Sequence, residues 1–476
     1  HSYSLHESFS ADMSGATLIN ETDLITDTTY TVIGISAGET RYYQVVTKDI
    51  FGLETASEST MGATYLFHAS FTNDWLCAEC GTGVIFISGM DGNVLAEATW
   101  TGNASFEIEV PEGLTELPEK ITVTTVEGND DGYNIAIMTH IDIPIGSSWT
   151  WGKDYPGPDQ DNPIEVEFDF QNVPDHSGYV ISSPWSAAIS ADDSITTPYG
   201  FTFFESSMDI YLKLNTAGTD PKYKWLTGVT AGSNSVDLSN LNDTESTTID
   251  LQGSSAHLAK YLYGYPYPGY RYSGRYRLDY DSAWDTTVTS VSVSYPPSAF
   301  SDYRTSLYIF DSQLNNDYWY NSVYGDIPNT FERIDTDFDF ISTSPNDFQI
   351  STITTNFSQI RSRWNQEADY HNIRWVVISA SDRSSYSLPA LSNSVIQYFP
   401  DVDRESFYLD WVRLHDYPEL SSYYETLDLV FNSPSFFYDI VNEFRHRVKY
   451  IDADRSLNMN ENIEMEDEYF EMYRPR

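Results

Sequence analysis

Apolar and polar residues alternate over most of the chain in short runs separated by turn residues, which is the pattern of β-strands. The clearest run is "IEVEFDFQNV", in which Ile164, Val166, Phe168 and Phe170 fall on one face. Similar runs are "RYYQVVTKD" near the start, "GVIFIS" after it and "FYLDWVRLHDY" late in the chain. The pattern therefore predicts a chain built mainly of half-buried strands.

Two segments near the C-terminal end show helical spacing instead. In the first, apolar residues recur every three or four positions: Leu420, Tyr424, Leu427 and Phe431. This spacing predicts a helix over 418–432. The second segment, 433–451, starts with Ser and Pro and places Ile440, Phe444 and Val448 on one helical face. We predict a helix there too, with a strand as the alternative because the segment is rich in Phe, Tyr and Val.

A chain of 476 residues is too long for one hydrophobic core. We predict a mostly β, multidomain protein in which β-sandwich modules are followed by a C-terminal α+β portion. Shifts in pattern at Gly/Pro-rich loops place the domains at residues 1–62, 63–155, 156–277 and 278–476.

The first module carries a family resemblance. Tyr42, Tyr43, Val45 and Thr47, followed by "KDIFGLETASES", resemble the last two strands of a fibronectin type III domain. The resemblance covers about residues 1–60 and lacks the first two strands of that fold. It implies a sandwich with an open edge, and it implies a spacer or adhesive module of an extracellular protein.

The second module also resembles a known family. The stretch "GVIFISGMDGNVLAEATWTGNASFEIEVPEG" reads as three strands joined by two Gly/Asn turns. Together with the strands after it, over about residues 65–150, it looks like the transthyretin-like, carboxypeptidase-regulatory-like modules of secreted bacterial proteins. The resemblance implies a small β-sandwich.

The charge balance limits the classes of partner that the chain is expected to bind. Asp and Glu number 71 against 25 Lys and Arg, which gives a formal net charge of −46. Such a chain repels nucleic acid and anionic membrane, and nothing in it is apolar over the ~20 residues that a transmembrane helix needs. It suits a saline extracellular setting or the outer cell surface, and it suits divalent cations such as calcium. Simple solubility is the alternative explanation.

The two cysteines form the motif "WLCAECGTG". A zinc site would need two further ligands, which no second CxxC or HxxxH supplies. A redox pair would open a helix, whereas glycines and a β-like run follow here. We therefore predict a disulfide between Cys77 and Cys80 across a turn, with free thiols as the alternative.

Calcium is the candidate cofactor, and its candidate ligands lie in "DADRSLNMNENIE". Asp452, Asp454 and Asn458 stand at alternating positions, as in a calcium loop. Leu457 replaces the glycine of an EF-hand and Ile463 replaces its bidentate Glu. A looser oxygen cage, rather than an EF-hand, is the resulting prediction.

The stretch "YLYGYPYPGYRYSGRYRLDY", residues 261–280, concentrates tyrosine and arginine. Alternating Tyr places one row of rings on one face of an extended segment. Since Tyr and Arg are enriched at interfaces, and Tyr rings also stack on sugars, six residues are candidate binding residues: Tyr265, Tyr267, Tyr270, Arg271, Tyr272 and Arg275. The competing interpretation is an interdomain strand whose rings pack inside the protein, with its arginines paired to Asp279 and Asp281.

No complete catalytic signature is present. The cluster of Asp403, Glu405 and Asp410 reads as a solvated strand edge. We therefore expect a structural or adhesive protein, such as a subunit of an extracellular assembly, that binds a protein partner or itself, rather than an enzyme. The alternative is a carbohydrate-binding accessory protein of a polysaccharide-degrading system, with glycan as the partner, and a hydrolase with a hidden site is a third reading.

Overall fold

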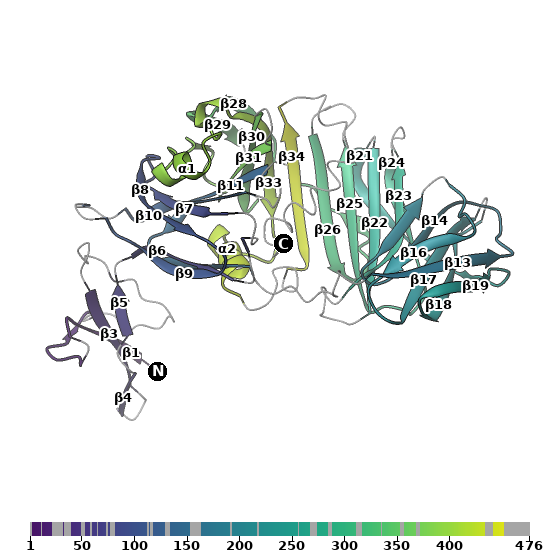
Figure 1. Cartoon of the computed structure of the whole chain (residues 1–476), viewed down its shortest axis with the longest axis horizontal. Helices are drawn as coiled ribbons and strands as arrows, with labels where there is room; N and C mark the ends of the chain where they lie inside the picture. The colour runs from purple at the N-terminus through teal and green to yellow at the C-terminus, as the bar shows by residue number, and fades with distance from the viewer. Residues whose placement is uncertain are drawn as a thin grey trace. The chain divides into compact units, whose positions relative to one another are not determined.

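A computed structural model of the chain shows a mostly β protein with several separate sheets, which confirms the predicted fold class (Figure 1). The described residues are these: 2–10, 12–20, 32, 40–48, 53–57, 60–63, 65–72, 75–76, 81–111, 114, 118–128, 134–152, 163–190, 193–216, 219–255, 257–266, 274–283, 288–310, 317–334, 336–352, 357–367, 372–433 and 441–451.

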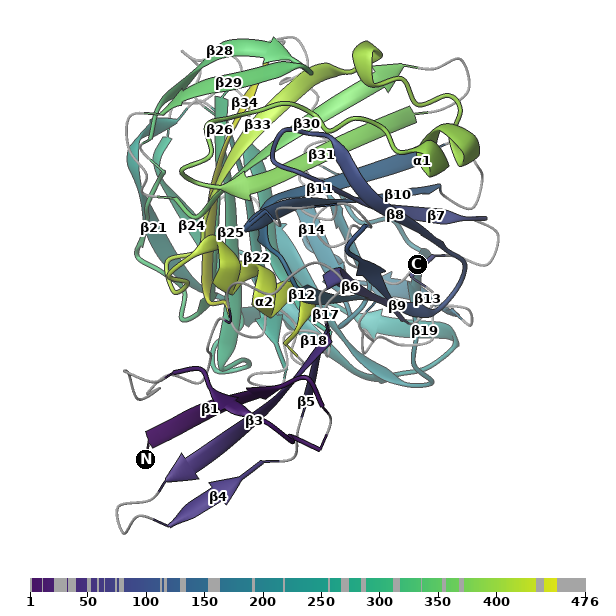
Figure 2. The same cartoon turned by 90° about the vertical axis from the view of Figure 1, so that its left-hand side faces the viewer.

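The N-terminal sheet consists of β1 (Ser2–Ser8), β2 (Thr17–Leu18), β3 (Thr40–Lys48), β4 (Glu54–Ala56) and β5 (Thr60–Ala63). Its strands are antiparallel in the order β2-β1-β3-β4, and β5 pairs with the other half of β3. Figure 2 shows β1, β3, β4 and β5 of this sheet. Residues 29–35 of the fibronectin-like stretch lie, apart from residue 32, outside the described residues. The fibronectin resemblance therefore stays a prediction.

The chain divides into two compact units. The first unit contains His1–Trp151, Gln366–Arg374 and Ser387–Ser406, and the second contains Gly152–Asn365, Trp375–Tyr386 and Phe407–Arg476. Because Gln366–Arg374 and Ser387–Ser406 belong to the first unit, each unit is built from segments that are not continuous in the sequence.

Past the N-terminal sheet, the first unit forms two ladders, β12-β6-β9 and β11-β10-β7-β8. Their bounds are β6 (Tyr65–Phe71), β7 (Gly83–Ser88), β8 (Val94–Trp100), β9 (Ala104–Glu109), β10 (Lys120–Gly128), β11 (Asn134–Pro144) and β12 (Ser147–Trp151). Phe71 stacks between Trp100 and Trp151, with ring centroids 3.9 and 4.8 Å away. Gly83 is required beside this stack, because a Cβ at that position would collide with the Trp100 ring.

In the second unit, two small sheets, β16-β13-β19 and β15-β14-β17-β18-β20, enclose one core. Their bounds are β13 (Ile164–Gln171), β14 (His176–Ser182), β15 (Ala187–Ser190), β16 (Tyr199–Phe203), β17 (Met208–Thr216), β18 (Lys222–Val229), β19 (Gly232–Asp237) and β20 (Asn242–Asp243). The alternation predicted for β13 is confirmed, since Val166, Phe168 and Phe170 are buried.

Seven neighbouring strands of the second unit form a large ladder in the order β23-β22-β25-β26-β34-β33-β30. They are β22 (His257–Tyr265), β23 (Tyr276–Ala283), β25 (Asp302–Phe310), β26 (Asp317–Gly325), β30 (Gln359–Glu367), β33 (Tyr408–Asp416) and β34 (Glu443–Tyr450). One face packs with β21 (Glu245–Ser255), β24 (Val288–Tyr295) and β27 (Thr330–Phe331) around an apolar core. The domain boundary predicted after residue 277 falls inside β23, so the strand runs through it.

The remaining elements are β28 (Phe338–Ser344), β29 (Asp347–Thr352), β31 (Asn372–Ala380), β32 (Ser385–Tyr386), α1 (Asn393–Tyr398), a 3-10 turn at Arg404–Ser406 and α2 (Tyr423–Phe431). The helix predicted over 418–432 is thus confirmed as α2. The helix predicted over 433–451 is wrong where the structure describes it, because residues 443–450 form β34. In β34 every second side chain falls on one face, namely Phe444, His446, Val448 and Tyr450. The backbone of β34 pairs with the neighbouring strands β26 and β33.

Replacing Ser422 by alanine is expected to destabilise α2 by about 1 kcal/mol. Ser422 is the N-cap, and its hydroxyl accepts a hydrogen bond from the Glu425 N–H at 3.2 Å. Urea denaturation followed by circular dichroism measures the change. Ser422→Asp, which keeps an acceptor at the cap, should behave as wild type, and an equal loss in both variants would contradict the capping role.

Candidate functional site

The tyrosine–arginine stretch lies partly inside the large ladder. Tyr261 and Tyr263 share one face of β22, with their rings stacked 6.2 Å apart, as the alternation predicted. Tyr265 is only 1% exposed, so its predicted role as an exposed binding residue is corrected: its ring packs in the core beside Tyr324. Arg275 is half-buried, its guanidinium lies 4.4 Å from the Tyr263 ring centroid, and its backbone N–H donates to the carbonyl of Pro184.

The other predicted site residues cannot be placed. Tyr267, Tyr270, Arg271 and Tyr272 lie outside the described residues, as do three further groups: the cysteines Cys77 and Cys80, and the calcium candidates Asp452, Asp454 and Asn458. Within the part of the chain that the structure describes, no group of three or more His, Cys, Asp or Glu is arranged to hold a metal ion.

A line of aromatic and imidazole rings crosses five neighbouring strands on the face of the ladder that carries Tyr261. We call Tyr261, Tyr308, Tyr320, His446 and His415 the ring row. Successive ring centroids lie 6.0, 4.5, 4.7 and 5.4 Å apart. The strand register brings them into line, because Tyr308 pairs with Tyr320, Tyr320 with His446 and His446 with His415.

Arg304 supports the middle of the ring row. Its side chain is 0% exposed, and it donates to the hydroxyls of Tyr320 at 2.8 Å and Ser322 at 2.9 Å. The Tyr320 hydroxyl donates in turn to Ser306, 3.2 Å away. A buried cation needs polar neighbours, and Arg304 finds them in these hydroxyl groups. The same hydrogen bonds hold the Tyr320 ring in one orientation.

The two histidines of the ring row are neutral. Burial is the main cause, and the positive charges of Arg361 and Arg413 add to it, so the pKa of both His415 and His446 lies well below the usual range. His415 is 3% exposed and His446 is 5% exposed. The Tyr417 hydroxyl lies 3.4 Å from His415 Nδ1 and accepts a hydrogen bond from Gln359 at 3.1 Å.

A second buried group joins β17 to β22 and β23. The carboxylate of Asp279, 2% exposed, forms ion pairs with Lys213 and with Lys260, the latter at 3.1 Å. It also accepts hydrogen bonds from the N–H groups of Tyr280 and Ser294. Burial opposes ionisation, but the lysines and the hydrogen bonds outweigh it, so the pKa of Asp279 is lowered. The predicted arginine partners of Asp279 are thus replaced by lysines.

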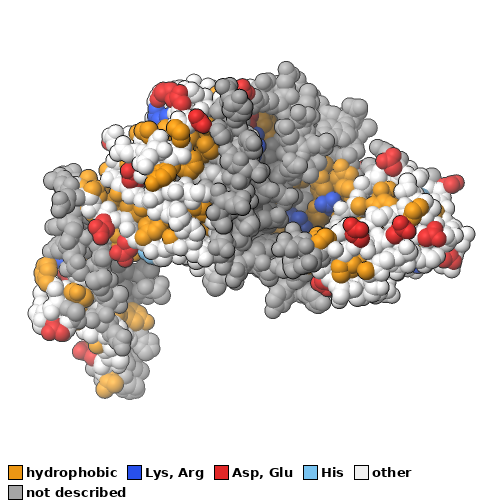
Figure 3. Space-filling model, in the orientation of Figure 1, with side chains coloured by type: hydrophobic (Ala, Val, Ile, Leu, Met, Phe, Trp, Pro, Cys, Tyr) orange, Lys and Arg blue, Asp and Glu red, His pale blue; other side chains and the backbone are white. Residues whose placement is uncertain are grey.

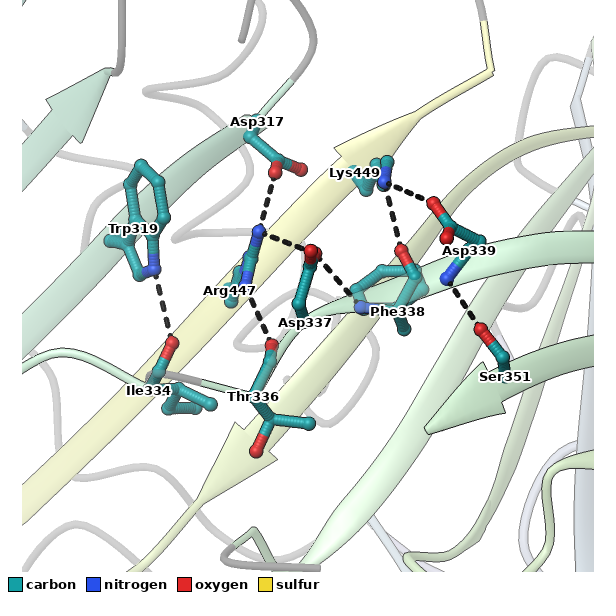
Figure 4. Close-up of polar contacts among 10 residues, drawn as sticks. All are labelled: Asp317, Trp319, Ile334, Thr336, Asp337, Phe338, Asp339, Ser351, Arg447 and Lys449. Atoms are coloured by element: carbon teal, nitrogen blue, oxygen red, sulfur yellow. Dashed lines mark hydrogen bonds and ion pairs between the residues drawn. The ribbon is translucent and has the colours of Figure 1, made fainter. Parts of the chain in front are cut away.

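A third polar group fastens β28 to the large ladder (Figure 4). Arg447 donates to the Thr336 carbonyl at 2.6 Å, to Asp317 at 2.7 Å and to Asp337 at 3.0 Å. Lys449, two residues further on the same face of β34, donates to the carbonyl of Phe338 at 2.8 Å. These contacts join β34 to β26, to β28 and to the residues just before β28, which is a structural arrangement.

The acidic cluster noted in the sequence does not form a catalytic pair. Asp410 is buried, and its carboxylate accepts hydrogen bonds from Arg363 at 2.8 Å and Asn365 at 3.0 Å. Asp403 accepts from the Ser406 hydroxyl and the Glu405 N–H in the 3-10 turn. These carboxylates hold local structure.

Sequence reasoning missed the ring row, although a signal for it was present. In "DYWYNSVYG" and "EFRHRVKY" the aromatic and imidazole side chains alternate with period two, like those of the 261–280 stretch. Reading all three segments as strands of one sheet would have brought their rings to a common face.

Comparison with known proteins adds little. No protein-family model matches the chain, and no curated protein matches it. A solved structure described as a Ca2+-stabilized adhesin that helps an Antarctic bacterium reach out and bind ice aligns with 70% of this chain and 90% of its own, at 9% identity and a TM-score of 0.11. A TM-score this low carries no argument about fold or function. None of the helices in the described residues combines the length and apolar character needed to cross a membrane.

Proposed function

We propose that the chain is a structural or adhesive component of an extracellular assembly, and that its N-terminal sheet makes the contact. The observation that carries the proposal is the exposure of Phe9 and Leu53, at 69% and 70%. Leu18 and Val45 of the same sheet are 39% exposed. Figure 3 shows hydrophobic side chains at the surface of this module, at the lower left. Phe9 follows the end of β1 that pairs with Tyr42, and Leu53 precedes the end of β4 that pairs with Lys48, so the two lie towards opposite ends of β3. Exposed apolar side chains along one small module offer contact points to a partner.

The construction of the sheet supports this proposal. Strands β1, β3 and β4 lie in the order expected for strands C, F and G of an immunoglobulin-like sandwich. Such modules serve as spacers and contact units in extracellular proteins. The outer strands are short, since β2 has two residues and β4 has three. β4 and β5 cover the outer side of β3, whereas β2 pairs with β1 at only two residues, so an added strand would extend the sheet at the β1 edge.

Self-association tests the proposal directly, with a second copy of the chain as the partner. Light scattering after size-exclusion chromatography should show oligomers whose fraction grows with protein concentration and with salt, because salt screens the net charge of −46. The double substitution Phe9→Ser/Leu53→Ser should shift the chain towards monomer. Ile341→Ser, at a side chain 59% exposed in the second unit, is the matched control and should leave association unchanged.

A monomer at every concentration, or equal association of wild type and the double variant, would contradict the proposed contact. The carbohydrate-binding alternative is then tested with a glycan array. Sugar binding that survives Phe9→Ser/Leu53→Ser would place the ligand site outside the N-terminal sheet.

A further inference from the structure

Two buried lysines share one buried carboxylate where β17 meets the edge of the large ladder. Lys213 of β17, Lys260 of β22 and Asp279 of β23 are 1%, 8% and 2% exposed. The Lys213 ammonium contacts Oδ1 of Asp279, and the Lys260 ammonium lies 3.1 Å from Oδ2. One carboxylate balances only one of the two positive charges, so ion pairing alone is a costly way to join these strands. The second lysine points to a further role for the group.

The two oxygens of the Asp279 carboxylate have different neighbours. Oδ2 accepts hydrogen bonds from Lys260 Nζ at 3.1 Å and from the Ser294 N–H at 2.8 Å. Oδ1 faces Lys213 Nζ and accepts the Tyr280 N–H at 2.9 Å. Two fixed donors on Oδ2 are the arrangement that stabilises negative charge there when a nucleophile adds to the carbonyl carbon. Oδ1, beside the protons of Lys213, is then placed to leave.

The group lies in apolar surroundings. Tyr211, Leu262 and Val293 lie within two residues of its members along β17, β22 and β24, and all three are core side chains with 0% exposure. Burial disfavours charge and lowers the pKa of Lys213. A lysine amine that has lost its proton is a nucleophile. The lowered pKa of Asp279 opposes protonation of the carboxylate, so a reaction within this pair is slow.

We propose that Lys213 and Asp279 condense in the folded chain to form an amide bond between their side chains. One proton passes from Lys213 Nζ to Oδ1, and the lone pair of the neutral amine adds to Cγ of Asp279. Oδ2 then carries the negative charge beside Lys260. The Cγ–Oδ1 bond breaks, and Oδ1 leaves as water with two of the three protons that Nζ carried. The step consumes one positive and one negative charge and needs no oxidant or reductant.

The amide fastens β17 to β23 covalently, across 66 positions of the sequence. The freshly folded chain is the ion-paired form, in which Asp279 is the counter-ion of both lysines. After condensation Lys260 keeps an acceptor, because the amide oxygen takes the place of Oδ2. The bond does not depend on the contact proposed for the N-terminal sheet, since it lies wholly in the second unit.

Intact-mass spectrometry of the 476-residue chain tests the proposal. Chain kept folded for a week should be lighter than its calculated mass by one water molecule, and chain kept in urea should not. Trypsin should fail to cleave after the condensed Lys213 and should release a branched peptide that contains both Lys213 and Asp279. The full calculated mass after a week, or a water loss that maps to other residues, overturns the proposal.

A lysine variant and a matched control locate the reaction. Lys213→Met removes the nucleophile but leaves Asp279 paired with Lys260, and it should keep its full mass. Lys222→Met is the control, because Lys222 forms an ion pair with Asp243 at the surface, and it should lose water as the wild type does. Loss of water from Lys213→Met overturns the assignment of the amine.

The role of Lys260 has its own readout, which is the rate of water loss. Lys260→Met leaves Lys213 and Asp279 as a balanced ion pair but removes one of the two donors on Oδ2. The water loss should slow by about a hundredfold, as when one donor of an oxyanion hole is removed. An unchanged rate overturns the proposed part of Lys260 in the reaction.

Discussion

Lowering the pH from 7 to 5 is expected to destabilise the second unit by about 4 kcal/mol. His415 and His446 are buried and neutral in the folded protein, and the pKa of each lies well below the ordinary value of 6.5. The unfolded chain binds a proton at each histidine below that value, and the folded chain does not. Stability is therefore fully present above about pH 6.5 and falls by about 1.4 kcal/mol per histidine for each further pH unit.

Urea denaturation at fixed ionic strength measures this slope, and hydrogen exchange in β33 and β34 locates it. His446→Gln should remove about half of the slope, whereas His68→Gln should keep all of it. Burial raises the pKa of Asp317 and Asp416, which offsets part of the loss at the acid end. An unchanged midpoint between pH 7 and 5 would show that the two histidines are protonated, or reach water, in the folded state.

Replacing Asp279 by asparagine is expected to cost about 3–5 kcal/mol. The carboxylate is the shared counter-ion of Lys213 and Lys260, which are 1% and 8% exposed. Asparagine keeps the size of the side chain but leaves two buried ammonium groups without a negative partner. Removing one side of a buried ion pair costs far more than the pair contributes in net terms, because the charge left behind is still desolvated.

Asp281→Asn is the matched control for that substitution. Asp281 lies two residues further along β23 and is exposed, so its loss should change stability by less than about 0.5 kcal/mol. Thermal and urea unfolding of both variants, side by side, give the comparison. Equal stability of Asp279→Asn and Asp281→Asn would mean that the lysines find other partners or lose their protons. In that case the pKa of Lys213, which burial already lowers, would have fallen below the working pH.

The strands were predictable from the sequence because alternation is a local property. In β13, Val166, Phe168 and Phe170 can face a core only if the segment is extended. The segment that forms β34 was harder to assign to helix or strand, because the spacing of Phe444 and Val448 fits both a helical repeat and a two-residue strand repeat. Its neighbours β26 and β33 resolved the ambiguity by pairing with its backbone, and their sequences lie far from it in the chain.

The candidate site was less predictable for the same reason. Tyr308, Tyr320 and His446 come from three separate segments and meet only through strand register. The 261–280 stretch drew attention by its local density of tyrosine, but local density does not reveal which face of a strand is buried. Tyr265 illustrates the point: a ring suited to an exposed platform lies in the core.

The position of β34 has a consequence for how the protein is made. The last described strand lies between β26 and β33, so the ladder of the second unit stays in two pieces until residues 443–450 have left the ribosome. Until then, β26 and β33 each expose an unpaired edge, which can pair with the wrong chain. Contacts between such distant segments also slow folding. Synthesis of this ladder therefore passes through a stage in which β26 and β33 have been made but lack the strand that later pairs with both.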